Sequence, residues 1–173
     1  MISRWAYILI GKNNTGKTNF QKWLIWFLCN SPKPGKLQLN LVHAVNHRDA
    51  PRKLKTLFTM NRSFQESYKD IDDYFQHHFK ETDVSILSSH SDPSSMNDIR
   101  AMITELQKKY YNVCAVFFTN SMNSDTENIA TLNWKEIIRI DNPHTADKEE
   151  WEKQIENGAK YFTDMVIKKA SLY

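Results

Sequence analysis

Apolar and polar positions follow one another along the chain in blocks that predict strands and helices in turn. The first block, Trp5 to Ile10, is almost wholly apolar, as in a parallel strand covered on both faces. Beyond a glycine-containing stretch, apolar residues recur at helical spacing and give a face that can pack on a sheet. These residues are Phe20, Trp23, Leu24, Phe27 and Leu28. The pattern therefore predicts a strand, a loop and a helix in succession.

The same alternation continues through the rest of the sequence. Turn-rich stretches such as 30–36, which holds two prolines and a glycine, separate the blocks. The segment 47–62 is basic and is expected to be irregular. Strands are expected within 36–45, 83–90, 112–120 and 135–141. Helices are expected over 63–79, from Met96 to Leu106 with Ser94 or Ser95 as N-cap, near 125–132, and from Asp147 onward, where Asp147 and Glu150 form a capping-box pattern.

This order of elements predicts the fold class. About five alternations of strand and helix indicate an α/β protein, a three-layer α/β/α sandwich with a mainly parallel sheet of about five strands. The length suits a single domain over residues 1–173. The loop after the first strand would then lie at the carboxyl edge of the sheet, where such folds bind ligands.

Composition narrows the setting of the protein. No apolar run approaches the roughly 20 residues of a membrane span, and the first residues lack a basic leader with a cleavage site. We therefore expect a cytoplasmic protein without a membrane span. Cys29 and Cys114 have no paired spacing, so we expect two buried free thiols.

Charge is distributed unevenly along the chain. Residues 1–62 carry a net charge of +10, whereas residues 63–173 carry −7. Anionic partners, whether nucleotide, acidic protein or nucleic acid, would be attracted to the basic end. The basic segment 48–62 has three interpretations: a loop that closes over bound substrate or nucleotide, a contact for nucleic-acid phosphates, or a solvated loop.

The loop after the first strand carries the most specific signal. Gly11, Gly16, Lys17 and Thr18 match the template G-x-x-x-x-G-K-[ST]. In such loops backbone N–H groups hold phosphate oxygens, the lysine reaches the β- and γ-phosphates, and the hydroxyl ligates Mg²⁺. The alternative is a glycine turn with a solvated lysine. We expect ATP and Mg²⁺ as ligands, bound by Gly11, Lys12, Asn13, Asn14, Thr15, Gly16, Lys17, Thr18 and Asn19.

The segment "GKNNTGKT" resembles the Walker A motif of the P-loop NTPase superfamily. Lys12, directly after the first glycine, further resembles the deviant loop of ParA/MinD-type ATPases. That resemblance implies that Lys12 acts beside Lys17 in catalysis, across a nucleotide-bound homodimer. Asn13, Asn14 and Asn19 are similar to the loop of RecF- and OLD-like ATPases, whose long insertions this chain cannot accommodate. Small P-loop kinases are a third comparison, with Arg48, Arg52, Arg62 and Arg100 as candidate phosphate clamps.

The metal and base contacts are less specified. The strand within 83–90 ends in Ser88, Ser89 and His90 where an acid is usual, so Asp92 is expected to join Thr18 at the metal. Asp49 is the other candidate, and water with phosphate oxygens could complete the shell. His90 could orient a water or sense the γ-phosphate, or simply end the strand. Asn120 is followed by Ser121 and Asn123 rather than a guanine-reading pattern, which favours adenine or weak base selection.

Three functions remain open at this point. The first is a small Mg²⁺-dependent ATPase whose nucleotide state switches a protein assembly. The second is a nucleoside or nucleotide kinase that uses the same loop. The third is a structural subunit that binds nucleotide without hydrolysing it, within a larger complex.

Overall fold

Six strands form one sheet in the computed structural model, which describes residues 3–172. The strand order is β2-β3-β4-β1-β5-β6, and β1 lies at the centre between β4 and β5. All neighbouring strands are parallel except β2 and β3, which are antiparallel. The strands are β1 (Arg4–Ile10), β2 (Leu41–Ala44), β3 (Thr56–Thr59), β4 (Val84–Ser89), β5 (Tyr111–Phe118) and β6 (Glu136–Ile140).

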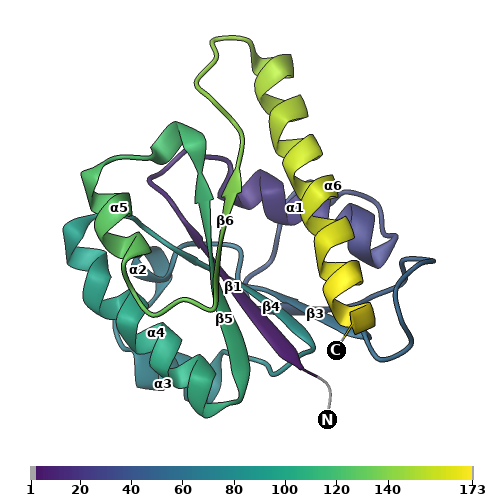
Figure 1. Ribbon diagram of the computed structural model, residues 1–173, viewed down its shortest axis with the longest axis horizontal. Helices are drawn as coiled ribbons and strands as arrows, with labels where there is room; N and C mark the ends of the chain where they lie inside the picture. The colour runs from purple at the N-terminus through teal and green to yellow at the C-terminus, as the bar shows by residue number, and fades with distance from the viewer. Residues whose placement is uncertain (1–2, 173) are drawn as a thin grey trace.

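Helices cover both faces of this sheet, so the fold has three layers (Figure 1). One face is covered by α1 (Lys17–Cys29) and α6 (Lys148–Leu172), which pack against each other. The other face is covered by α2 (Phe64–Ser67), α3 (Ile71–His77), α4 (Met96–Lys108) and α5 (Ser124–Ala130). The predicted α/β architecture with a mainly parallel sheet is thus confirmed.

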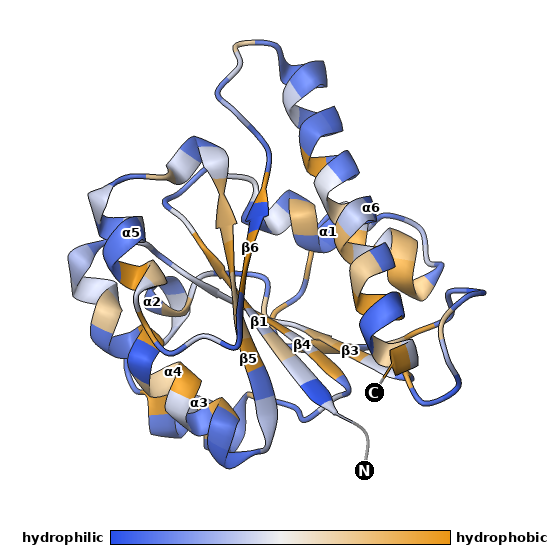
Figure 2. Cartoon of the chain, viewed as in Figure 1, coloured by the Kyte–Doolittle hydropathy of each residue, from blue (hydrophilic) through white to orange (hydrophobic). Residues whose placement is uncertain are grey.

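The core is divided between the two faces of the sheet. Side chains of β1 alternate: Tyr7 and Leu9 pack toward α1 and α6, whereas Ile8 and Ile10 pack toward the opposite helices. In Figure 2 the strands are mostly hydrophobic and the outer helix surfaces mostly hydrophilic. Such burial on both faces explains why the parallel strands read as continuous apolar runs in the sequence.

The sheet has one strand more than the expected five, and one expected strand is shorter than predicted. The predicted strand at 36–45 is reduced to β2, because Asn40 adopts a left-handed conformation (φ 54°) and Leu37 turns into the core instead. The segment expected to be irregular contains β3, a four-residue strand whose strongly basic surroundings masked it. Both ends of β3 therefore lie within a segment whose basic composition predicts an irregular, solvent-exposed loop.

The predicted helix over 63–79 is two short helices, α2 and α3. Tyr68 is extended (φ −135°), and Asp70 starts the second helix by accepting a hydrogen bond from the Asp73 N–H at 2.8 Å. Ser95 occupies the N-cap position of α4 but makes no side-chain cap bond. Asp147 accepts bonds from the N–H groups of Glu149 and Glu150, although the Glu150 carboxylate bonds Thr145 and leaves the capping box incomplete.

Other expectations concern the whole chain. Cys29 and Cys114 are buried free thiols, as predicted, and burial raises the pKa of each to about 12. No helix within residues 3–172 has the length and apolarity needed to cross a membrane. The ends of the predicted domain, residues 1, 2 and 173, lie outside the described residues.

Candidate functional site

The loop of residues 11–16 connects the end of β1 to the start of α1 and is called the glycine loop below. Both of its glycines are required by packing. A Cβ at Gly11 would lie 2.8 Å from Thr15 Oγ1, and one at Gly16 would lie 2.5 Å from Ile155 Cδ1. Gly16 also has a positive φ of 105°, which side chains disfavour. The motif glycines therefore let the loop curl tightly beneath α6.

The backbone conformation of the glycine loop also suits one of its two asparagines. Asn14 has φ 61°, in the left-handed region that asparagine tolerates better than most residues. An asparagine at this position is therefore compatible with the backbone path of the loop.

The N-terminus of α1 faces solvent beside this loop without a side-chain cap. The first intrahelical bond runs from the Phe20 N–H to the Gly16 carbonyl at 2.8 Å. The N–H groups of Lys17, Thr18 and Asn19 precede this bond and so have no acceptor within the helix. A helix N-terminus of this kind carries partial positive charge and suits a bound anion.

The Lys17 side chain folds back over the glycine loop. Its Nζ donates hydrogen bonds to the carbonyls of Gly11 at 2.5 Å and Lys12 at 2.8 Å. The residue is only 8% exposed, and burial lowers the pKa of its ammonium to about 8, against the opposing effect of Glu66 and Asp92. Lys17 is therefore not a solvated surface lysine.

Loops after β5 and β6 hold the glycine loop in place. The Lys12 N–H donates to Ser121 Oγ at 3.1 Å. The Thr15 carbonyl accepts bonds from Asn142 Nδ2 at 3.0 Å and from Asn120 Nδ2 at 3.4 Å. In the sequence, Asn120 and Ser121 stand out only because they do not match a guanine-reading pattern, and Asn142 carries no signal beyond following a predicted strand. All three are positioned by the parallel sheet, which brings the strands' carboxyl ends together.

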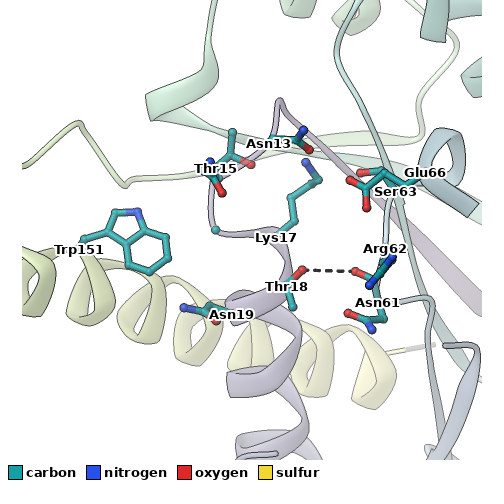
Figure 3. A pocket seen from close by; sticks show the side chains of 12 residues that line it. Asn13, Thr15, Lys17, Thr18, Asn19, Asn61, Arg62, Ser63, Glu66 and Trp151 are labelled. Atoms are coloured by element: carbon teal, nitrogen blue, oxygen red, sulfur yellow. Dashed lines mark hydrogen bonds between the residues drawn. The ribbon is translucent and has the colours of Figure 1, made fainter. Parts of the chain in front are cut away.

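A hollow of about 430 Å³ lies over the glycine loop and the start of α1 (Figure 3). Seven consecutive residues of the predicted nucleotide site, 13–19, line it, whereas Gly11 and Lys12 do not. Its volume is in the range typical of small-molecule sites. The remaining lining residues are Asn61, Arg62, Ser63, Glu66 and Trp151.

Glu66 is the acidic residue that lines the hollow. It lies across the hollow from Lys17, on α2, and its Oε1 is 3.0 Å from His90 Nε2 (Figure 3). Asp92 does not line the hollow, and its carboxylate is 3.9 Å from His90 Nδ1. The sequence predicts a helix over 63–79 that includes Glu66, but it does not predict β3, which ends at Thr59 and leads the chain into α2.

Two residues beside Glu66, Ser63 and Arg62, have polar groups that make no side-chain hydrogen bond or ion pair within residues 3–172, respectively. Ser63 is 2% exposed, and its Oγ has no hydrogen-bond partner in the described part of the chain. The sequence Ser63-x-x-Glu66 is a capping-box pattern, yet neither side chain caps α2. The Arg62 guanidinium forms no ion pair within residues 3–172.

The opposite end of the hollow is formed by α6. Trp151 lies there, with its Cζ2 atom 3.6 Å from the position of a Cβ on Gly16. The next residue, Glu152, accepts hydrogen bonds from Asn19 Nδ2 and Trp23 Nε1, both at 2.9 Å, and pairs with Lys33. This network joins α1, α6 and the 30–36 turn.

Oxygen donors near the loop suit a hard cation. Thr18 is exposed, and its Oγ1 makes one long hydrogen bond of 3.5 Å to the Asn61 carbonyl. Ser63 and Glu66 line the same hollow. No cluster of three acidic, histidine or cysteine side chains occurs in the described part of the chain. The donor set therefore fits Mg²⁺ that keeps several waters and shares phosphate oxygens, and not an all-protein cage.

Several predicted residues lie away from the hollow. Because β2 is antiparallel, its end and the residues after it lie at the amino edge, where the Asn46 N–H bonds the Leu28 carbonyl at the far end of α1. A 13-residue helix spans about 20 Å, so Arg48, Asp49 and Arg52 are remote from the glycine loop. Arg100 is exposed on α4 and bonds Asn97. Of the basic segment 48–62, only its end reaches the site.

No known protein family matches this sequence, and no curated protein matches it. The interpretation of the site therefore depends on its geometry.

Proposed function

We propose that the chain is a P-loop protein that binds ATP with Mg²⁺ at the glycine loop and cleaves the bond to the γ-phosphate. One observation carries this proposal: the buried Lys17 ammonium and the uncapped N-terminus of α1 meet at a single hollow at the carboxyl edge of the parallel sheet. Both features favour phosphate, and the sequence pattern between them is that of a phosphate-binding loop.

Each residue of the hollow has a role in this proposal. The N–H groups at the start of α1 hold phosphate oxygens, and Lys17 moves from the loop carbonyls to the β- and γ-phosphates. Thr18 Oγ1, with Ser63 Oγ nearby, would hold Mg²⁺, which neutralises phosphate charge when bound. Trp151 offers an aromatic face to the base, which fits adenine without demanding it.

Glu66 is the residue that we assign to proton transfer. In hydrolysis, a water oxygen would attack the γ-phosphorus, the bond to the β-phosphate oxygen would break, and the Glu66 carboxylate would accept the proton of the water. His90, hydrogen-bonded to Glu66, holds the carboxylate in place. This arrangement replaces the strand-end acid that the sequence lacks.

The side chain of Lys12 favours a nucleotide-state switch as the biological use of this chemistry. Lys12 is exposed and does not line the hollow of its own chain, so it is available to the phosphates of a second copy. We expect ATP to induce a homodimer that Lys12→Ala prevents while the monomer still binds ATP. Size-exclusion chromatography with light scattering measures this directly, and a dimer that forms equally well in the variant would contradict the switch.

The proposal is tested by ATP binding and product formation. Wild type, Lys17→Ala and the matched control Lys55→Ala, a lysine at the amino edge of the sheet, would be compared by calorimetry and by ADP and phosphate assays with Mg²⁺. We expect Lys17→Ala to weaken ATP binding by about 100-fold and Lys55→Ala to leave it unchanged. Binding without any product would favour the non-hydrolysing structural subunit, and equal binding in all three proteins would refute the site.

A further inference from the structure

A second hollow adjoins the first one. It measures about 870 Å³ and shares Thr18, Asn61, Arg62 and Glu66 with the hollow over the glycine loop. Its other wall is formed by Lys22 of α1 and by residues 35–39. A molecule in this second hollow would therefore contact the same residues that face the phosphate end of a bound nucleotide.

Hydrogen bonds hold the walls of the second hollow in position. Asn61 Nδ2 donates to the Leu37 carbonyl at 2.7 Å, and the Asn61 N–H donates to Gln21 Oε1 at 3.1 Å. Lys22 Nζ bonds the Gly35 carbonyl. The 35–39 segment is thus tied to α1 and to the end of β3, so the hollow exists before any ligand binds.

The charge in this hollow selects an anion. Three cations line it, Lys22, Lys36 and Arg62, against one carboxylate, Glu66, which is hydrogen-bonded to His90. Within residues 3–172, neither Lys36 nor Arg62 forms an ion pair. Arginine and lysine together bind phosphate well, because the guanidinium forms paired bonds and the ammonium adds a mobile charge.

Apolar surface accompanies these charges. Leu37 is buried beneath the segment, while Leu39 is 43% exposed beside the hollow. A phosphorylated organic molecule would contact both the cationic and the apolar surface of the hollow. Inorganic phosphate or water would contact only the cationic part.

We propose that the second hollow binds a phosphomonoester that accepts the γ-phosphoryl group from ATP in the glycine loop. This inference rests on the proposed nucleotide site. An acceptor oxygen would attack the γ-phosphorus and form the new P–O bond, the bond to the β-phosphate oxygen would break, and its electron pair would leave with ADP. A hydroxyl acceptor gives its proton to the Glu66 carboxylate, whereas a phosphate acceptor attacks as the dianion and has no proton to transfer. Arg62 and Lys36 hold the acceptor's phosphate.

The test follows radioactive label from γ-labelled ATP·Mg²⁺. The probes are the five common nucleoside 5′-monophosphates, ribose 5-phosphate and glucose 6-phosphate, each beside its dephosphorylated counterpart. We expect at least one phosphomonoester to divert label from inorganic phosphate into a new product, while its neutral counterpart does not. For that acceptor, Lys36→Gln and Arg62→Gln should raise KM about tenfold, and Lys55→Gln at the amino edge should not.

The outcomes separate this inference from the proposed function. If the protein binds or hydrolyses ATP but no phosphomonoester changes how the label divides between inorganic phosphate and other products, the acceptor site alone is overturned. Equal KM values in Lys36→Gln and Lys55→Gln would also overturn it. A wild-type protein that neither binds nor consumes ATP would refute the nucleotide site and the acceptor site together.

Discussion

The two ends of the hollow over the glycine loop differ in how completely their polar groups are paired. At the α6 end, Glu152 joins Asn19, Trp23 and Lys33 in one network beside Trp151. At the α2 end, Arg62 has no ion partner in the described chain, and the buried Ser63 Oγ has no hydrogen bond. Glu66 completes this second end.

This difference suggests that the α6 end mainly stabilises the fold and that the α2 end takes part in catalysis or ligand binding. A paired network stabilises the fold, whereas a buried polar group without a partner costs free energy and calls for an explanation such as a catalytic role or a bound ion or water. We therefore expect substitutions at the α2 end to change catalysis or ligand binding with little loss of stability. Substitutions at the α6 end should change stability or base binding without affecting the chemical step.

Glu66→Gln should give the largest effect. The amide keeps the size of the side chain but cannot accept a proton, so we expect about a 100-fold loss in the rate of ATP cleavage with ATP affinity retained. Asp92→Asn is the matched comparison, because the sequence favours Asp92 as the carboxylate beside the metal. Steady-state kinetics would decide between them, and a larger loss in Asp92→Asn would transfer the role to that residue.

Trp151→Ala tests the base contact at the α6 end. Loss of a stacked base costs about 1–3 kcal/mol, so we expect ATP affinity to fall about tenfold or more while tripolyphosphate affinity is unchanged. Trp26→Ala, an exposed tryptophan near the far end of α1, is the control. Calorimetry with both ligands provides the measurement. Parallel losses for ATP and tripolyphosphate would mean that Trp151 supports the loop and does not contact the base.

Ser63→Ala should separate function from folding most clearly. Removing a hydroxyl without a partner should leave the free energy of unfolding unchanged or slightly higher, yet lower Mg²⁺·ATP affinity about fivefold. Ser121→Ala is the opposite case, because it leaves the Lys12 N–H without its acceptor and should cost about 1 kcal/mol of stability. Urea denaturation and calorimetry on both variants check this contrast. A destabilised Ser63→Ala would indicate a structural role.

The sequence predicted the glycine loop and the start of α1 better than the residues that line the hollow from distant segments. The apolar run into Gly11 and the periodic helix after Lys17 depend on local patterns, and β1 and α1 lie where those patterns put them. The position of those lining residues depends on contacts between distant segments. Glu66 reaches the hollow only because β3 exists, and β3 is four residues long in basic surroundings, too short for periodicity to reveal.

The antiparallel edge explains the other misplaced residues. A sheet assumed to be parallel puts every loop that follows a strand at the carboxyl edge, and Asp49 was expected near the metal on that basis. The reversed direction of β2 instead sends residues 46–55 to the amino edge. The direction of β2 is set by its pairing with β3. The local sequence around Asp49 gives no sign of that pairing.

Glu152→Gln should have the smallest effect and concerns stability. Burial raises the pKa of the Glu152 carboxyl, but bonds from Lys33, Trp23 and Asn19 outweigh burial and hold the pKa below its usual value. A depressed carboxyl pKa stabilises the fold above the pKa of the unfolded chain, and this contribution is lost as pH falls through the folded value. We expect the variant to lose about 1 kcal/mol at pH 7, a modest figure because the carboxylate is partly exposed.

The deficit of Glu152→Gln should begin to shrink as the pH falls below the usual glutamate pKa of about 4.5, where the unfolded chain takes up the proton. It should disappear only once the pH is below the lowered pKa of the folded carboxyl, where the wild-type side chain is itself protonated. Urea unfolding at pH 7 and pH 3.5 measures both values, with Glu156→Gln, one turn further along α6, as the control. ATP affinity at pH 7 should stay close to that of wild type, since Glu152 pairs with the support network and does not line the hollow. A large loss of ATP affinity would mean that the Asn19 contact shapes the phosphate site, and the two ends would then be coupled.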